Sequence, residues 1–257
     1  LSENLALPER WILSRFYSTL QKVDKSLLNY RFNETASALR EFFWHEFCDW
    51  YLEIIKDRFQ DKNTQIVAYK ILEKSLRVLH PIMPFITEEV YSRLSPDSGS
   101  IMVQTWPHLQ KQMLDKKTDS QMQTLIDLIT SIRNIRAEWN IDSSKKIDAL
   151  LKTSDATTKK LLEENSSIIK NLTKVENLTI SDSIKRPENC ACAVLAKFDL
   201  FIPLADVIDI TKEKLRLQAQ LQEQENFLKN TSARLKNKEF IKKAPKEIVA
   251  KEKIKQS

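Results

Sequence analysis

Residues 29–54 carry apolar side chains at every third or fourth position, which is the period of an amphipathic helix. Asn33 is the expected N-cap, because its short side chain can accept a backbone N–H that the first helical turn leaves unpaired. The predicted stripe is wide, so neighbouring elements must cover this helix on more than one side. We expect it to be the central helix of a helical domain. Its stripe is Phe32, Ala36, Leu39, Phe43, Phe47, Trp50 and Ile54.

Three other segments are expected to pack around this helix. The first begins at Pro8, which suits a first helical turn because no N–H is needed there. The second begins with Asn63 or Thr64 as its N-cap and ends before Pro81, since proline disfavours helix at the preceding residue. The third is the short stretch 84–94. Four amphipathic helices joined by short links predict a helical bundle.

A fifth helix is expected at 119–139. A turn-rich break at 95–100, which holds the one glycine of the chain, and a short extended crossing at 101–106 precede it. We assign residues 1–140 to the helical domain. The inward residues of the fifth helix are Met122, Leu125, Ile126, Ile129, Ile132 and Ile135.

The apolar period changes after about residue 145 to that of short strands, which predicts a small α+β module at 141–205. Cys190 and Cys192 lie two apart on one strand and are expected to be small buried thiols. A zinc half-site is the alternative, but zinc takes about four ligands and the sequence has no second pair. We therefore predict no metal site. Strands are expected at 146–152, 178–180, 191–198 and 200–204, and a helix at 156–172.

Residues 206–257 have the pattern of a coiled coil. The residues of one narrow seam are spaced alternately by four and by three positions, which is the repeat of a coiled coil. Polar members weaken the seam, so a first helix here needs a partner. Pro245 suits the start of a returning helix, which predicts an antiparallel hairpin whose second helix is shorter than its first. The seam is Leu217, Leu221, Gln224, Leu228, Thr231 and Leu235.

Composition excludes several classes of protein. The chain has 257 residues and one glycine, against about 7 % in average proteins, so glycine-rich phosphate loops and doubly wound nucleotide sites are excluded. No apolar run approaches the roughly 20 residues of a membrane-spanning helix. Three cysteines are too few for a disulfide framework and favour a reducing compartment. The fold class is mainly α.

The basic charge is concentrated at one end. Residues 212–257 hold 13 lysines and arginines against 6 glutamates, a net charge of +7. The first 211 residues hold 28 basic and 29 acidic side chains, so they carry a net charge of −1. Such a distribution is typical of a segment that binds a polyanion, with nucleic acid the first candidate.

The sequence contains no recognisable catalytic motif. The histidines that could act as bases near neutral pH are His45, His80 and His108, and we assign each a structural role. Adjacent acidic residues such as Glu88 and Glu89 face different sides of a helix, so they do not form a carboxylate pair. We therefore predict no catalytic residue in this chain.

Trp44-His-Glu-Phe-Cys-Asp-Trp-Tyr-Leu-Glu53, preceded by Leu28-Asn-Tyr-Arg-Phe-Asn-Glu34, closely resembles the helical anticodon-binding domain of valyl-tRNA synthetases. Three later stretches are similar to this family in the same order. The histidine–proline stretch is shared with related class I synthetases, whereas Phe-Cys-Asp-Trp-Tyr and Phe-x-x-Lys-Ala-Pro point to the valine enzymes. The three stretches are 79–89, 132–138 and 237–245.

The resemblance implies the C-terminal part of a valine–tRNA ligase: anticodon-binding bundle, linker module and tRNA-binding arm. Catalytic and editing domains would precede Leu1, with ATP and Mg²⁺ used there and no cofactor in this chain. The implied partner is tRNA(Val), with no DNA or membrane, and the whole enzyme would be a cytoplasmic monomer. An earlier family helix is absent, so an exposed apolar groove is expected in its place. Asp206 replaces a usual family glycine, so we expect the entry into the arm to differ from that of the family.

Basic residues are the candidate tRNA contacts. On the anticodon side we name Arg31, Arg133 and Arg136, because flat guanidinium groups pair phosphates and stack on bases. Salt bridges to carboxylates such as Glu138 are the alternative. In the arm, lysines and arginines would contact phosphates of the tRNA elbow, with a solvated coiled-coil face as the alternative. The arm candidates are Lys212, Lys214, Arg216, Lys229, Arg234, Lys236, Lys242, Lys243 and Lys246.

A second function remains open from the residues alone. The chain could be a helical protein–protein interaction module that dimerises through its coiled coil. Salt distinguishes the two hypotheses, because binding to tRNA phosphates weakens steeply as salt rises.

Overall fold

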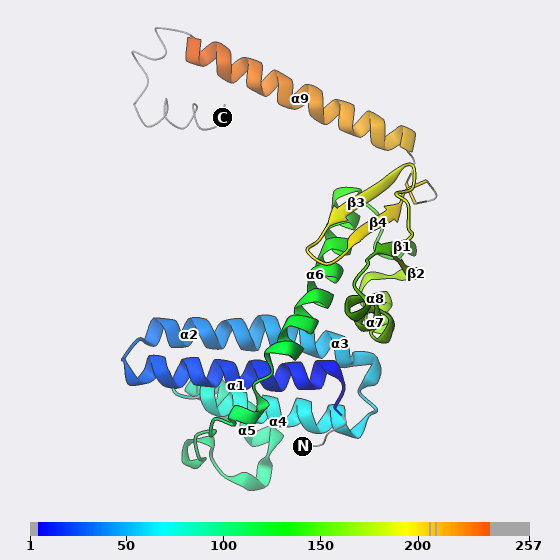
Figure 1. Ribbon diagram of the computed structural model, residues 1–257. Helices are drawn as coiled ribbons and strands as arrows, with labels where there is room; N and C mark the ends of the chain where they lie inside the picture. The colour runs from blue at the N-terminus through cyan, green and yellow to red at the C-terminus, as the bar shows by residue number, and fades with distance from the viewer. Residues whose placement is uncertain (1–4, 206, 209, 237–257) are drawn as a thin grey trace.

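The computed structural model describes residues 5–205, 207–208 and 210–236 (Figure 1). A helical domain is followed by a four-stranded sheet with two helices and then by one long helix. The helices are α1 (Leu7–Leu28), α2 (Phe32–Arg40), α3 (Glu53–Ile55), α4 (Lys62–Leu79), α5 (Pro84–Leu94), α6 (Lys116–Glu138), α7 (Ala156–Glu164), α8 (Ser166–Thr173) and α9 (Ile210–Lys236). The strands are β1 (Ile147–Lys152), β2 (Val175–Ser181), β3 (Cys190–Val194) and β4 (Asp199–Pro203).

Five shorter helical segments join these elements. One is a π-helical stretch between α2 and α3, and four are single turns of 3₁₀ helix. They are η1 (Glu41–Leu52), η2 (Lys56–Arg58), η3 (Pro96–Ser98), η4 (Ile101–Val103) and η5 (Lys111–Met113).

Helix α1 occupies the centre of the helical domain. It contacts α2, η1, α4 and α6, whereas the predicted central helix lies to one side of it (Figure 1). Pro8 lies in its first turn, as expected. One apolar face of α1 is buried along most of its length, at Trp11, Ile12, Phe16, Leu20 and Val23. The bundle is therefore confirmed, but its middle element is the first helix rather than the second.

The helix predicted over 29–54 changes its period in the middle. In η1 the backbone hydrogen bonds follow the π pattern, reaching five residues instead of four, so each turn holds more residues. The buried side chains there are Phe42, Phe47 and Tyr51, spaced by five and four. Phe32, the first residue of the predicted stripe, is 62 % exposed. The uniform stripe was wrong in two places: Phe32 lies at the exposed start of α2, and the π segment rotates the buried face further along.

Two predicted caps were also wrong. Helix α2 begins two residues earlier than an N-cap at Asn33 would give, with Arg31 at its N-cap. The N-cap of α4 is Asp61, whose Oδ2 accepts the N–H of Thr64 at 2.9 Å. The predicted crossing at 101–106 contains the 3₁₀ turn η4 instead of extended backbone. By contrast, α5 has the predicted bounds and α4 ends directly before His80.

The sheet has the strand order β2-β1-β4-β3. Strands β1 and β2 are parallel, and the other two pairings are antiparallel. The predicted helix at 156–172 is two helices, because the chain turns at Asn165 between α7 and α8. Cys190 is half-buried and Cys192 is exposed, so the expectation of two buried thiols was wrong.

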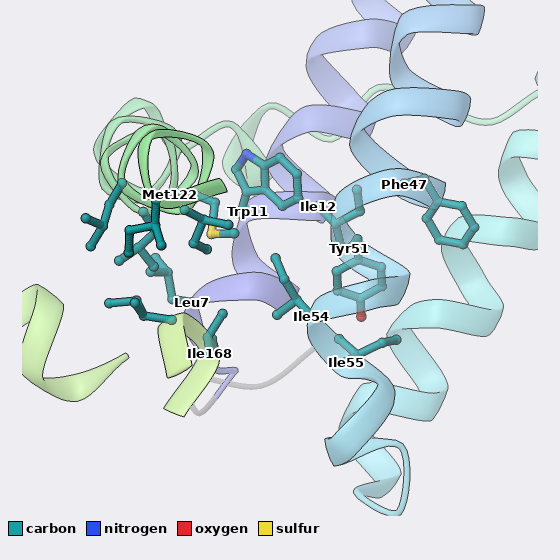
Figure 2. Close-up of a cluster of buried hydrophobic side chains, with 14 of the residues drawn as sticks. Leu7, Trp11, Ile12, Phe47, Tyr51, Ile54, Ile55, Met122 and Ile168 are labelled. Atoms are coloured by element: carbon teal, nitrogen blue, oxygen red, sulfur yellow. The ribbon is translucent and has the colours of Figure 1, made fainter. Parts of the chain in front are cut away.

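One apolar core joins the helical domain to the α+β module. Figure 2 shows Leu7 and Trp11 of α1, Met122 of α6 and Ile168 of α8 pointing toward one another, with Ile54 of α3 beside them. All five residues are less than 9 % exposed. Helix α8 therefore packs against the helical domain as well as against its own sheet.

Helix α9 leads away from the module (Figure 1). The predicted first helix of the arm is thus present. Its seam residues Leu217, Leu221 and Leu228 are between 44 % and 61 % exposed. The returning helix predicted after Pro245 lies outside the described residues.

Candidate nucleic-acid interface

Arg31 lies at the exposed tip where α1 passes into α2. Its Nη1 is 3.3 Å from Glu34 Oε1, and both side chains are more than half exposed. Exposed ion pairs of this kind contribute little, so Arg31 can exchange Glu34 for a phosphate at small cost. Lys22 and Lys25 line the same hollow, of about 240 Å³. The tip is therefore a basic surface with three cationic side chains.

Two aromatic rings stand beside Arg31. Tyr30 is 81 % exposed and Phe32 is 62 % exposed, with their ring centroids 6.5 Å apart. Tyr30 has a φ of 56°, a left-handed conformation that turns the chain between the two helices. Periodicity assigned Phe32 to the core, so sequence analysis missed this pair. The sequence signal that could have revealed this exposed pair was a residue outside the helical period, directly before the start of a helix.

Arg133 projects from α6 toward two different elements. Its guanidinium carbon lies 5.4 Å from the ring centroid of Trp50 in η1, a cation–π contact. Its Nε and Nη2 donate to the carbonyl of Leu172 in α8 at 3.3 and 3.2 Å. The rest of the side chain is exposed. Arg133 is thus accessible to solvent and already has two partners.

Arg136 is only 8 % exposed. Its Nη1 donates to the carbonyl of Thr173 at 3.3 Å, and Nη2 donates to the carbonyls of Lys145 at 2.8 Å and of Asp142. Burial lowers the pKa of Arg136, and the charge of Asp142 opposes that shift. The alternative of a salt bridge to a carboxylate such as Glu138 was wrong for Arg136, because its hydrogen-bond partners are carbonyls, and its contact with tRNA stays a prediction. This geometry gives Arg136 a structural role.

Three of the arm candidates have described side chains. Lys214 and Lys229 are exposed on α9. Arg216 is half-buried and donates from Nη2 to the carbonyl of Glu138 at 3.4 Å. Lys212, Arg234 and Lys236 belong to α9, but the description does not extend to their side chains. Lys242, Lys243 and Lys246 lie outside the described residues.

An apolar groove of about 770 Å³ runs between α2–η1 and α4–α5. It is lined by Phe43, Trp44, Leu72, Leu79, Met83, Ile86 and eight further residues. Trp44 is 62 % exposed in it. An exposed apolar groove is thus present among the described residues, and its assignment to the place of an earlier family helix stays a prediction.

The histidines take part in local contacts. His45 Nδ1 is 2.9 Å from Asp49 Oδ2 on the same helical face, and His80 Nδ1 is 2.7 Å from Thr87 Oγ1. His108 is exposed. Within the part of the chain that the structure describes, no group of three or more His, Cys, Asp or Glu side chains could hold a metal ion. No helix there is long and apolar enough to cross a membrane.

Comparison with known proteins matches both ends of the chain to described families. Residues 9–151 match the anticodon-binding domain of tRNA ligases, and residues 209–257 match the valyl-tRNA synthetase tRNA-binding arm. The first match covers the whole helical domain from α1 to β1. The second covers α9 and the segment with the excess positive charge.

Curated relatives align over almost the whole chain. Valine–tRNA ligase of Listeria innocua is 36 % identical over all of this chain, and that of Oceanobacillus iheyensis is 35 % identical over the same extent. Valine–tRNA ligase of Thermotoga maritima is 34 % identical over 96 % of the chain. The chain spans about 30 % of the length of these relatives. The chain belongs to the anticodon-binding domain family of tRNA ligases, with a valyl-tRNA synthetase tRNA-binding arm at its C-terminal end.

Proposed function

We propose that this chain is the tRNA-binding part of a valine–tRNA ligase and positions tRNA(Val) for aminoacylation. The observation that carries the proposal is the coincidence of charge and family match. The arm match spans residues 209–257, and the net charge of +7 falls on residues 212–257. The names of the relatives support valine as the amino acid. The aminoacylation chemistry, with its ATP and Mg²⁺, would belong to parts of the longer protein outside this chain.

Two separate surfaces would contact the tRNA. The arm would hold backbone phosphates through Lys214, Lys229 and the candidates beyond the described residues, since lysine binds phosphate as a point charge. The tip with Arg31 offers both cations and exposed rings, the combination that binds unpaired bases by stacking. Arg133 is a third candidate because its outer surface is exposed. We also propose a cytoplasmic location, where aminoacylated tRNA is used.

The test uses filter binding to measure the affinity of the full chain for a tRNA(Val) transcript over a series of salt concentrations. Each phosphate neutralised contributes a slope of about −0.7 to −0.9 in log K against log salt. A slope of about −3 or steeper is expected from the arm alone. Binding that does not respond to salt would contradict the proposal.

Sedimentation of the same samples tests the dimerising module. Coiled-coil dimers that form with rising protein concentration, in a chain that does not bind tRNA, would favour that function instead. The match of residues 209–257 to a tRNA-binding arm supports the first function over the second.

A further inference from the structure

Two arginines on one face of α6 cap the end of α8. A helix leaves its last carbonyls without intrahelical partners, and its C-terminus carries a partial negative charge. Helix α8 ends at Thr173, followed by Lys174 with a φ of 57°. Arg133 and Arg136, one helical turn apart, donate to the carbonyls of Leu172 and Thr173. The pair therefore supplies the hydrogen bonds that α8 cannot make itself.

The same two arginines also hold elements on either side of α8. Arg133 lies against the ring of Trp50, which belongs to η1. Arg136 reaches the loop before β1 through the carbonyls of Asp142 and Lys145. Together they connect η1, α6, α8 and the start of the sheet. Lysine could not replace them, because only guanidinium presents a flat fork of five donors.

The start of the arm continues this set of contacts. Lys145, whose carbonyl Arg136 binds, donates from Nζ to the carbonyl of Val207 at 2.8 Å, shortly before α9. Arg216 of α9 donates to the carbonyl of Glu138, the last residue of α6. These two bonds link the start of α9 to Lys145 and to the end of α6, beside the groups that the two arginines bind.

We propose that Arg133 and Arg136, with Trp50, form a clamp that fixes the angle between the helical domain and the arm. They are positioning residues, which act on tRNA through the placement of α9, and a direct contact of Arg133 with tRNA is the alternative that the binding test below separates. Buried carbonyls without donors are unfavourable, so the clamped arrangement is stabilised over the open one.

The distance between the two parts tests the clamp directly. In a chain whose native cysteines are alanine, Lys70→Cys on α4 and Gln224→Cys on α9 carry spin labels, and pulsed EPR gives their distance distribution. Both positions are exposed. The variant Arg133→Ala/Arg136→Ala is expected to widen the distribution about twofold or more. A distribution as narrow as that of the unsubstituted chain would overturn the clamp.

Two controls keep this result interpretable. A second label pair, Gln21→Cys with Lys70→Cys, lies within the helical domain and should give the same narrow distribution in every variant. Arg93→Ala removes an exposed arginine that pairs with Glu89 on α5, and should leave both distributions unchanged. If the double variant unfolds the helical domain, Arg133→Ala alone takes its place, because Arg133 is exposed and its loss frees one carbonyl.

Binding to tRNA(Val) separates positioning from direct contact, and this readout rests on the proposed function. Two sites on a rigid body bind with a higher effective concentration than two sites on a mobile one. The clamp predicts that Arg133→Lys/Arg136→Lys weakens binding about tenfold and leaves the salt slope unchanged. If the two arginines instead contact phosphates, lysine at both positions should preserve the affinity for tRNA(Val). That result would overturn the positioning role. Failure of the unsubstituted chain to bind tRNA would contradict the proposed function and leave the distance test intact.

Discussion

Helices α6 and α9 are similar in length, 23 and 27 residues, and opposite in surroundings. On α6, Met122, Leu125 and Ile129 have no exposed surface. On α9, Leu217, Leu221 and Leu228 keep 44 % to 61 % of their surface exposed. Both helices are amphipathic in sequence. The difference is that α6 contacts α1, α8 and β3, whereas the seam of α9 is exposed at its three leucines and buried at Thr231.

This difference separates stability from binding. The apolar stripe of α6 joins the helical domain to the α+β module and so carries folding free energy. The segment that contains α9 holds the excess positive charge, and its exposed faces can meet a polyanion. Substitutions in the two helices should therefore affect different measurements.

The largest expected difference between the two helices is in the free energy of unfolding. Ile129→Ala on α6 removes buried methylene groups from a site with no exposed surface, which typically costs about 2–5 kcal/mol. Leu221→Ala on α9 is the matched change at a position 61 % exposed, and should cost less than about 1 kcal/mol. Urea unfolding, monitored by circular dichroism, measures the loss of stability in both variants. Equal losses would mean that the seam of α9 is covered as well as α6 is.

A smaller effect concerns the arm. Lys242→Glu/Lys243→Glu should raise the Kd for tRNA(Val) about tenfold, or about 1.4 kcal/mol, and flatten the salt slope by about 2. Lys70→Glu changes an exposed lysine on α4 and serves as the control, with little change in Kd expected. Filter binding across a salt series gives both quantities. Unchanged affinity in the arm variant would refute a role for these two lysines.

The smallest effect is on the pH dependence of stability. Asp115 caps α6 by accepting bonds from Thr118, and these bonds lower the pKa of Asp115. The unfolded chain binds this proton more readily, so the stabilisation is complete above about pH 5 and is lost as pH falls through the folded pKa. Asp115→Asn keeps an acceptor, costs less than about 1 kcal/mol at pH 7, and should reduce the loss of stability on acidification.

Asp119, one turn further along α6, is the control, because its effect on the pH dependence of stability has the opposite sign. Burial raises the pKa of Asp119, so protonation there favours the folded state at low pH. Asp119→Asn should therefore make the loss of stability on acidification larger. Urea midpoints at pH 6 and pH 3.5 measure both variants. Parallel changes in the two would contradict the assignment of the cap.

Much of the fold could be predicted from the sequence because the signals are local. Proline at a first helical turn marks the starts of α1 and α5, and proline after a helix end marks the end of α4. The π segment could not be predicted, because its apolar residues satisfy two periods and only packing against α1 selects one. The caps Asp61 and Arg31 were missed for a related reason. Several neighbouring polar residues can start a helix, and the sequence does not say which one does.

The types of residue in the candidate interface could be predicted from the sequence, but the groups that they contact could not. Counting charges located the basic segment, since its excess lies within 46 residues. Residue type also selected Arg133 and Arg136, which are three residues apart and so share a face of α6. That face meets the carbonyls at the end of α8, 37 or more residues later in the chain. Only the tertiary structure reveals that a basic face binds its own backbone.

The contact between Trp50 and Arg133 has an optical consequence. A half-buried indole that becomes exposed to water emits at longer wavelength and is more open to quenching by solutes. Trp50 would respond in this way whenever the arginine leaves its ring. With the other four tryptophans, Trp11, Trp44, Trp106 and Trp139, changed to phenylalanine, its emission would report the opening in real time. The protein thus contains its own fluorescent reporter at the junction on which the direction of its arm depends.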